Sequence, residues 1–305
     1  VLAAGAVTWR DGFVASGGVA VGADNSLIGS KAQDRVGNGG VVSLDLGRYV
    51  VVSHQWSLDP DALTSAPAVA EVGAVTFVDP ALPARGAGVV SAANSLVGSS
   101  EFDHVGFGSN GVDGVVALKL GDQASGNYVV VSPDWQQPAA GLVPAALVGA
   151  VTWGSGDGSS VGAVNAGNSL VGSTTGDRIG SGGVVALTNG NYVVASPQWS
   201  NADPLADGTP NLVANVGAVT WRDGGTANPD VVSTTNSLHG SSSGDRVGNG
   251  GADMNFDLGA GFVGAGVVAL SNGNYVVVSP NWSNAEDPTN PIGSVGAVTW
   301  RDGYG

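Results

Sequence analysis

The sequence predicts an all-β protein made of four tandem repeats of about 70 residues, each contributing one small four-stranded sheet. Three observations lead to this prediction. Glycine is abundant, with 51 residues in 305; short Val-rich phrases recur in a fixed order; and the segments between them are rich in Gly, Asn, Asp and Ser. This composition is typical of many short strands joined by tight turns. No stretch shows the 3.6-residue apolar spacing of an amphipathic helix, so we expect few or no helices.

Each repeat contains the same four strand phrases, because Val, Tyr, Thr and Trp favour pleated surfaces. In chain order these are GVVxL, YVVxS, GAVTW and NSLxGS. The GVVxL phrases occupy 40–44, 114–118, 183–187 and 266–270, and the YVVxS phrases open at Tyr49, Tyr128, Tyr192 and Tyr275. Asn-Gly pairs at 189–190 and 272–273 predict tight hairpins between these two strands. Prolines at 133, 197 and 280 should end the YVVxS strands.

The YVVxS strands carry apolar runs without alternation, as at 50–52 and 129–131. Continuous apolar runs indicate strands buried on both faces. We therefore expect small sheets to stack face to face around an axis, in a β-propeller-like architecture. The whole chain, 1–305, is predicted to be a single repeat domain. Its approximate units are 9–76, 77–152, 153–220 and 221–299, with an extra terminal strand phrase at 295–305.

All eight tryptophans fall at only two positions of the repeat. A side chain that recurs at the same place in every unit is expected to anchor the same joint each time. We therefore predict that these residues are structural anchors: Trp9, Trp153, Trp221 and Trp300 after GAVT, and Trp56, Trp135, Trp199 and Trp282 after YVVxS.

The third unit resembles an FG-GAP repeat, the building block of integrin α-chain β-propellers and of many bacterial exoproteins. The resemblance is carried by residues 172–180, 183–187, 191–197 and 217–221; Ile179-Gly180 matches the family's FG, and Ala195-Ser196-Pro197 its GAP. The phrases are also similar to repeats in large bacterial haemagglutinin-like surface proteins. This resemblance implies a propeller, a secreted or cell-surface location and an adhesive role. The alternating-Asp calcium loop of the family is missing, so its calcium sites do not transfer.

The number of strand phrases leaves three arrangements open. GAVTW or GAVTF occurs five times, whereas each of the other phrases occurs four times. A closed ring would join the last three strands to the first NSL strand and leave one GAVTW copy over. Alternatively, the chain is a slice of a longer array, or the surplus strand pairs with a neighbouring molecule by edge addition and forms a fibre.

Charge and composition limit the partners. The net charge of −15 argues against nucleic acid, which needs a basic face. With no cysteine, disulfides and thiolate metal sites are excluded. The longest apolar stretches are too short and too glycine-rich for membrane insertion. A basic and apolar leader is not visible at Val1, so we expect any signal peptide to have been removed or to lie outside this sequence.

Four groups of residues carry candidate chemistry. Two GxSxG matches, 158–162 and 240–244, lack the helix that a nucleophile elbow needs and are interpreted as coincidences. The three histidines, His54, His104 and His239, occupy different repeat positions and are interpreted as surface substitutions that do not converge.

An acidic residue followed by Arg or His recurs in every unit. The structural interpretation is that the carboxylate accepts backbone N–H bonds and fixes a turn. The alternative is cation binding, with calcium as the expected ion. The candidate residues are Asp34, Asp103, Asp177 and Asp245.

The fourth unit carries an insertion at 252–265, and insertions in repeat arrays usually form loops on one face. It is the candidate partner-binding segment, with Asp253, Met254, Asn255, Phe256 and Asp257 as its most distinctive residues.

Together these observations predict a non-enzymatic structural or adhesive module of a secreted or cell-surface bacterial protein, which self-associates or packs against neighbouring repeats. The alternative is a propeller that binds a glycan or a protein through one loop face. A hydrolase is the weakest of the three hypotheses, because no acid–base constellation appears.

Overall fold

The computed structural model describes residues 2–13, 18–59, 68–82, 86–108, 114–119, 125–138, 146–203, 208–209, 211–250, 266–285 and 292–305. These residues form short strands in five sheets, with one 3-10 turn at Asp45–Gly47. The fold is therefore all-β, as the composition and the strand phrases predict.

The five sheets are numbered from the N-terminus, and the strands of each sheet are named in the order in which they pair. The first sheet contains β1 (Ala6–Val7), β2 (Leu27–Ile28) and β6 (Gly88–Val89). The second contains β11 (Gly162–Ala163), β7 (Ser95–Val97), β5 (Ala74–Val78), β4 (Tyr49–Ser53) and β3 (Val41–Ser43). The third contains β16 (Asp230–Val231), β12 (Ser169–Val171), β10 (Ala150–Gly154), β9 (Tyr128–Ser132) and β8 (Val115–Ala117). The fourth contains β13 (Gly183–Ala186), β14 (Tyr192–Ser196), β15 (Ala218–Arg222) and β17 (Leu238–His239). The fifth contains β18 (Val267–Ala269), β19 (Tyr275–Ser279) and β20 (Ala297–Arg301).

Local sequence explains the antiparallel core of each sheet. The hairpin between β13 and β14 is closed by a hydrogen bond from Leu187 N–H to Asn191 O at 2.8 Å. Gly190 in this turn has a φ of 92°, a backbone conformation in which a residue with a side chain would be strained. The strands β9, β14 and β19 end at the serine before a proline, because proline has no N–H for the ladder. The predicted hairpins and strand ends are confirmed.

Three sheets contain a further strand that the sequence analysis missed. Strands β6, β11 and β16 each come from the segment before the next NSL phrase and pair in parallel with β2, β7 and β12. Each pairing joins only two residues of either strand. Among the described residues the prediction of four strands per sheet holds for the fourth sheet, whereas the second and third sheets have five strands and the first and fifth have three.

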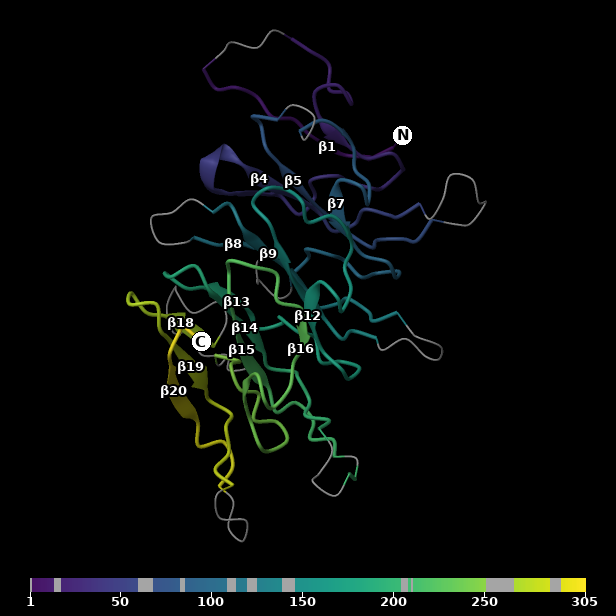
Figure 1. The fold of residues 1–305 in the computed structure, drawn as a ribbon. Helices are drawn as coiled ribbons and strands as arrows, with labels where there is room; N and C mark the ends of the chain where they lie inside the picture. Colours follow the sequence, from purple (N-terminus) through teal and green to yellow (C-terminus); the bar gives the residue numbers. More distant parts are fainter. Residues whose placement is uncertain are drawn as a thin grey trace.

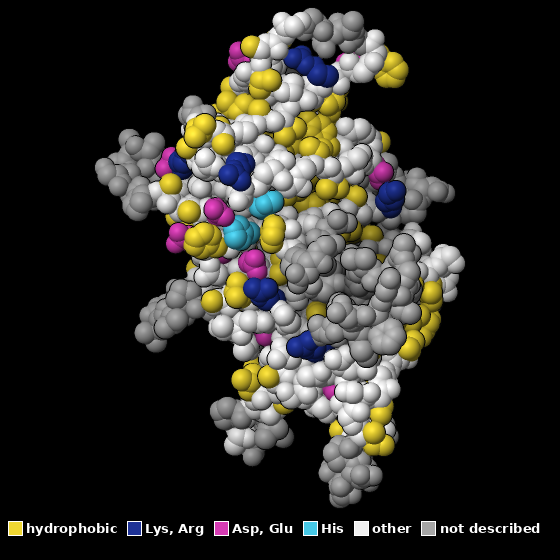
Figure 2. Space-filling view, turned by 180° about the vertical axis from the view of Figure 1, so that it is seen from behind, with side chains coloured by type: hydrophobic (Ala, Val, Ile, Leu, Met, Phe, Trp, Pro, Cys, Tyr) yellow, Lys and Arg dark blue, Asp and Glu magenta, His cyan; other side chains and the backbone are white. Residues whose placement is uncertain are grey.

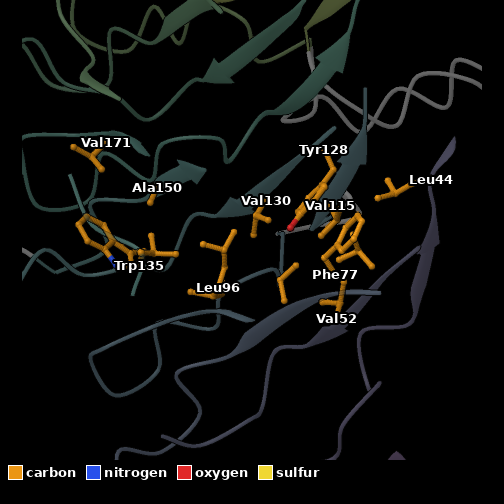
Figure 3. Close-up of a cluster of buried hydrophobic side chains, with 14 residues drawn as sticks. Leu44, Val52, Phe77, Leu96, Val115, Tyr128, Val130, Trp135, Ala150 and Val171 are labelled. Atoms are coloured by element: carbon orange, nitrogen blue, oxygen red, sulfur yellow. The ribbon is translucent and has the colours of Figure 1, made fainter. Parts of the chain in front are cut away.

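The sheets stack face to face, one after another from the N-terminal end (Figure 1). Figure 3 shows the layer between the second and third sheets, where Val52, Phe77 and Leu96 face Val115, Tyr128 and Val130. The rings of Phe77 and Tyr128 stack with their centroids 6.3 Å apart. Both faces of the central strands are buried, as the apolar runs predict, because each sheet is covered by the next.

The described strands do not close into a ring. Strand β1 pairs with β2, β20 pairs with β19, and no strand pairing among the described residues joins the first sheet to the last. In Figure 1 β1 and β20 lie at opposite ends of the stack. The closed ring, one of the three arrangements that the sequence left open, is therefore not found among the described residues, which make an open stack of mixed sheets.

Candidate functional site

The recurring aspartate is the most deeply buried charged residue of each repeat. Asp177 in the third unit is fully buried, and its Oδ2 accepts the N–H groups of Ser173 and Thr174 at 2.9 and 2.8 Å. Its Oδ1 accepts the N–H of Ser200 at 3.0 Å, from the turn that follows β14. One carboxylate thus holds its own turn and a distant one together.

The same three contacts recur in the other units. Asp34 binds Ser30, Lys31 and Ser57; Asp103 binds Ser99, Ser100 and Gln136; Asp245 binds Ser241, Ser242 and Ser283. Burial raises the pKa of Asp103 and Asp177 above the usual value, and the backbone N–H bonds act in the opposite direction. A raised pKa in the folded state means that these two carboxyls add stability at acidic pH and lose that contribution as the pH rises through the folded pKa.

This geometry matches the structural interpretation of the Asp-Arg step. The residue after each aspartate has a positive φ, between 43° and 46°, so the carboxylate also fixes an uncommon backbone conformation. Among the residues that the structure describes, no group of three His, Asp or Glu side chains could hold a metal ion. Calcium binding by these aspartates stays an untested prediction.

The tryptophans at the second repeat position are core residues. Trp56, Trp135 and Trp199 are buried, and Trp282 in the last unit packs partly buried against the core between the fourth and fifth sheets. Figure 3 shows Trp135 beside Ala150 and Val171. Their anchoring role follows from the apolar area that each indole buries.

The tryptophans of the GAVTW strands hold consecutive sheets together. Trp153 Nε1 and Asn127 Nδ2 both donate to the Gly224 carbonyl, at 2.9 and 3.1 Å, across the joint from the third to the fourth sheet. Trp221 and Asn191 bind the Gly303 carbonyl in the same way, at 2.9 and 3.0 Å. A Cβ on Gly224 would lie 1.8 Å from a backbone oxygen, so this close approach requires glycine.

The joint between the first two sheets differs from these. Pro80 of the second sheet stands where the later units have the accepting glycine. In the next joint, between the second and third sheets, Phe77 stands at the donor position and has no N–H to donate. Trp9 remains 46% exposed and borders a hollow of about 380 Å³ that is also lined by Arg10, Asp79 and Leu82. At the other end Trp300 is 58% exposed. Among the hydrogen bonds of the described residues, a GAVTW tryptophan therefore donates across a joint at Trp153 and Trp221, and Trp9 and Trp300 stay half-exposed.

Two histidines from neighbouring units do converge, contrary to the sequence interpretation. His54 and His104 both lie against the ring of Phe107, with centroid distances of 4.9 and 5.7 Å. His104 Nε2 lies 3.1 Å from Glu71 Oε2, and its Nδ1 lies 3.7 Å from Asp134 Oδ2. The carboxylates of Asp134 and Glu71 raise the pKa of His104, whereas burial lowers the pKa of His54. His239 lies elsewhere, edge-on to Trp199.

The insertion of the fourth unit, with Asp253 to Asp257, lies outside the described residues. Its proposed role in partner binding is neither supported nor contradicted. Within the part of the chain that is described, no helix is long and apolar enough to cross a membrane.

Comparison with protein-family models places the repeats in one family. Residues 1–38, 43–107, 123–181, 186–249 and 269–305 each match a repeat of unknown function (DUF5650). The chain belongs to the DUF5650 repeat family. A search of curated proteins found no match. The DUF5650 assignment confirms the tandem repeat, but it does not identify FG-GAP repeats. The fourth-unit insertion falls between two of the DUF5650 segments.

Proposed function

We propose that the chain is a non-enzymatic structural and adhesive module of a secreted or cell-surface bacterial protein. The observation that supports this most directly is that the repeated polar side chains described above join turns, strands or consecutive sheets. The aspartates bind two turns, the Asn and Trp donors bind the next sheet, and Thr152 Oγ1 lies 2.8 Å from Ser169 Oγ between adjacent strands. A site for turnover would need polar groups that converge on an open space.

The end sheets support assembly between copies. A complete sheet has the strand types GVVxL, YVVxS, GAVTW and NSL; the first sheet has only the last two of these and the fifth only the first three. The free edge of β20 is therefore the edge on which an NSL strand lies in the inner sheets. We propose that the free edge of β20 pairs with strand β2 of a second copy. In that copy β20 would replace β1 as the antiparallel partner of β2.

Side chains at these ends agree with that pairing. In the first sheet Thr8 Oγ1 lies 2.6 Å from Ser26 Oγ, and Thr299 stands at the equivalent place in β20. Such a contact is heterologous, because it joins the C-terminal end of one molecule to the N-terminal end of the next. A heterologous contact without closure extends into a fibre.

The test is the oligomeric state of the whole chain with and without a charge on the free edge of β20. Val298 is 73% exposed, so Val298→Lys should leave the fold and Tm unchanged while it blocks edge pairing. Analytical ultracentrifugation and electron microscopy should show concentration-dependent filaments for the original chain and monomers for the variant. Arg10→Lys, which leaves both edges as they are, is the control.

Three outcomes would overturn parts of this proposal. Filaments that persist unchanged in Val298→Lys would exclude pairing at β20, and an original chain that stays monomeric at all concentrations would exclude self-assembly. Turnover of any substrate in an ester and glycoside panel would contradict the non-enzymatic role.

A further inference from the structure

The near-identical repeats provide an internal reference for unusual residues, and several of these lie together in space. We define the His104 patch as His54, Glu71, Phe102, His104, Phe107 and Asp134. At the equivalent places the other units have different residues: Gln33, Gly176 and Gly244 for Phe102; Asn38, Ser181 and Asn249 for Phe107; and arginine for His104. Figure 2 shows histidine, hydrophobic and acidic side chains gathered on this face.

The patch is built around one imidazole. The rings of Phe102 and Phe107 flank His104 with centroid distances of 5.9 and 5.7 Å. Glu71 holds the imidazole at Nε2, and Asp134 faces Nδ1 and also forms an ion pair with Arg178 at 3.3 Å. Contacts from three successive repeats thus fix the rings at the surface.

Folding alone does not account for the two phenylalanines. Phe102 is 49% and Phe107 47% exposed, so each leaves much of its apolar ring in water. Phe102 also has a φ of 65°, a conformation in which a bulky side chain is strained, and two other units place glycine there with φ of 86° and 83°. An exposed ring on a strained backbone is typical of a functional position.

We propose that the His104 patch binds a neutral saccharide, with sugar rings stacked on Phe102 and Phe107 and hydroxyl groups donating to Glu71. Aromatic faces attract the C–H groups of a sugar ring, and an ionised carboxylate accepts hydroxyl donors. The Glu71 side chain is 40% exposed and can accept from a ligand beside its bond to His104.

The charges of the patch select against ionic ligands. The His104 imidazole already lies between the two rings, with centroid distances of 5.9 and 5.7 Å, so the place where a cation would stack is occupied. The neighbouring carboxylates raise the pKa of His104, which favours its charged form and adds repulsion against a second cation. Glu71 and Asp134, together with a net charge of −15 for the chain, repel anions. A neutral polyol avoids both repulsions. This inference goes beyond the structural role proposed above and does not depend on filament formation.

The experiment compares the whole chain with a variant that restores the repeat pattern. Phe102→Gly with Phe107→Asn reproduces residues that other units carry at these places, so the fold and Tm should be kept. The probe is an array of immobilised neutral, uronic-acid and sialylated oligosaccharides, followed by calorimetric titration of the best neutral glycan. We expect saturable binding to neutral glycans and a loss of at least about tenfold in affinity in the variant.

Control variants locate the site. Phe13→Ala removes a fully exposed ring elsewhere and should leave binding unchanged, and Glu71→Gln should weaken it while the rings remain. The proposal is overturned if no neutral glycan binds at about 1 mM, if only acidic glycans bind, or if the double variant binds as well as the original chain. It is also overturned if Trp9→Ala, beside the hollow of the first joint, is the variant that abolishes binding.

Discussion

The same four residues, Ala-Val-Thr-Trp, form most of β10 in the third sheet and of β20 in the fifth, and their surroundings differ completely. In β10 a strand pairs on either side, and Val151 is 1% exposed. In β20 one side is paired with β19, and the equivalent Val298 is 73% exposed. The local sequence therefore specifies a strand in both places, whereas burial depends on the sheets and strands that surround it. The following predictions test this difference between inner and end sheets.

The largest effect is expected at the aspartate that ties the inner turns together. Asp177→Ala leaves three backbone N–H groups without their charged acceptor, that of Ser200 in a buried place, and should lower the free energy of unfolding by about 3–5 kcal/mol. Chemical denaturation measures this loss. Asp177→Asn, which keeps one acceptor oxygen, should be intermediate; a loss below about 1 kcal/mol for the alanine variant would show that the carboxylate does not hold the turns.

The paired valines test burial directly. Val151→Ala removes two buried methyl groups and should cost about 2–3 kcal/mol, while Val298→Ala should change stability by less than about 0.5 kcal/mol. Both values come from urea unfolding of dilute protein. An equal loss in the two variants would show that β20 is covered in solution.

The GAVTW tryptophans test the hydrogen bond across the joint. Trp153→Phe, which copies the natural Phe77, removes the bond from Nε1 to the Gly224 carbonyl and should cost about 1 kcal/mol. The matched variant Trp300→Phe should have almost no effect, because no described residue accepts from Trp300. Thermal unfolding of the two variants side by side distinguishes them, and equal shifts in Tm would contradict the difference between inner and end joints.

The smallest expected effect concerns pH. The pKa of His104 is raised in the folded state, so its stabilising contribution is complete below the ordinary pKa of about 6.5 and is lost as the pH rises through the folded value. His104→Arg restores the residue of the other units and should remove this pH dependence, with a change below about 1 kcal/mol. Tm measured from pH 5 to 9 in both proteins tests this; identical profiles would assign the dependence to other groups.

Several elements could be predicted because their causes are local. Proline ends three strands, Asn-Gly closes two hairpins, and apolar runs without alternation are buried on both faces. The aspartate turn was also predictable, because two of its three donors lie within four residues of it. The third donor, from the turn after β14, was not visible because it comes from 23 residues away.

Other features could not be predicted from the phrases. The parallel strands β6, β11 and β16 have only two residues each, and their partners lie about one repeat earlier in the chain. A short Val-Val or Ala-Val pair before each NSL phrase was the available signal. His54 and His104 were interpreted as dispersed because they occupy different positions of the repeat, but the packing of two neighbouring units brings these two positions together at Phe107.

The sequence by itself determined the all-β class, the repeat and the order of the four strand phrases, because these follow from side-chain preference and periodicity within about 70 residues. Only the tertiary structure decided that the described stack is open, that the last two joints are made by Asn and Trp donors to a glycine carbonyl, and that the departures of neighbouring units form one patch. The physical reason is that these contacts join residues from different repeats. Identical phrases cannot specify which copy lies beside which.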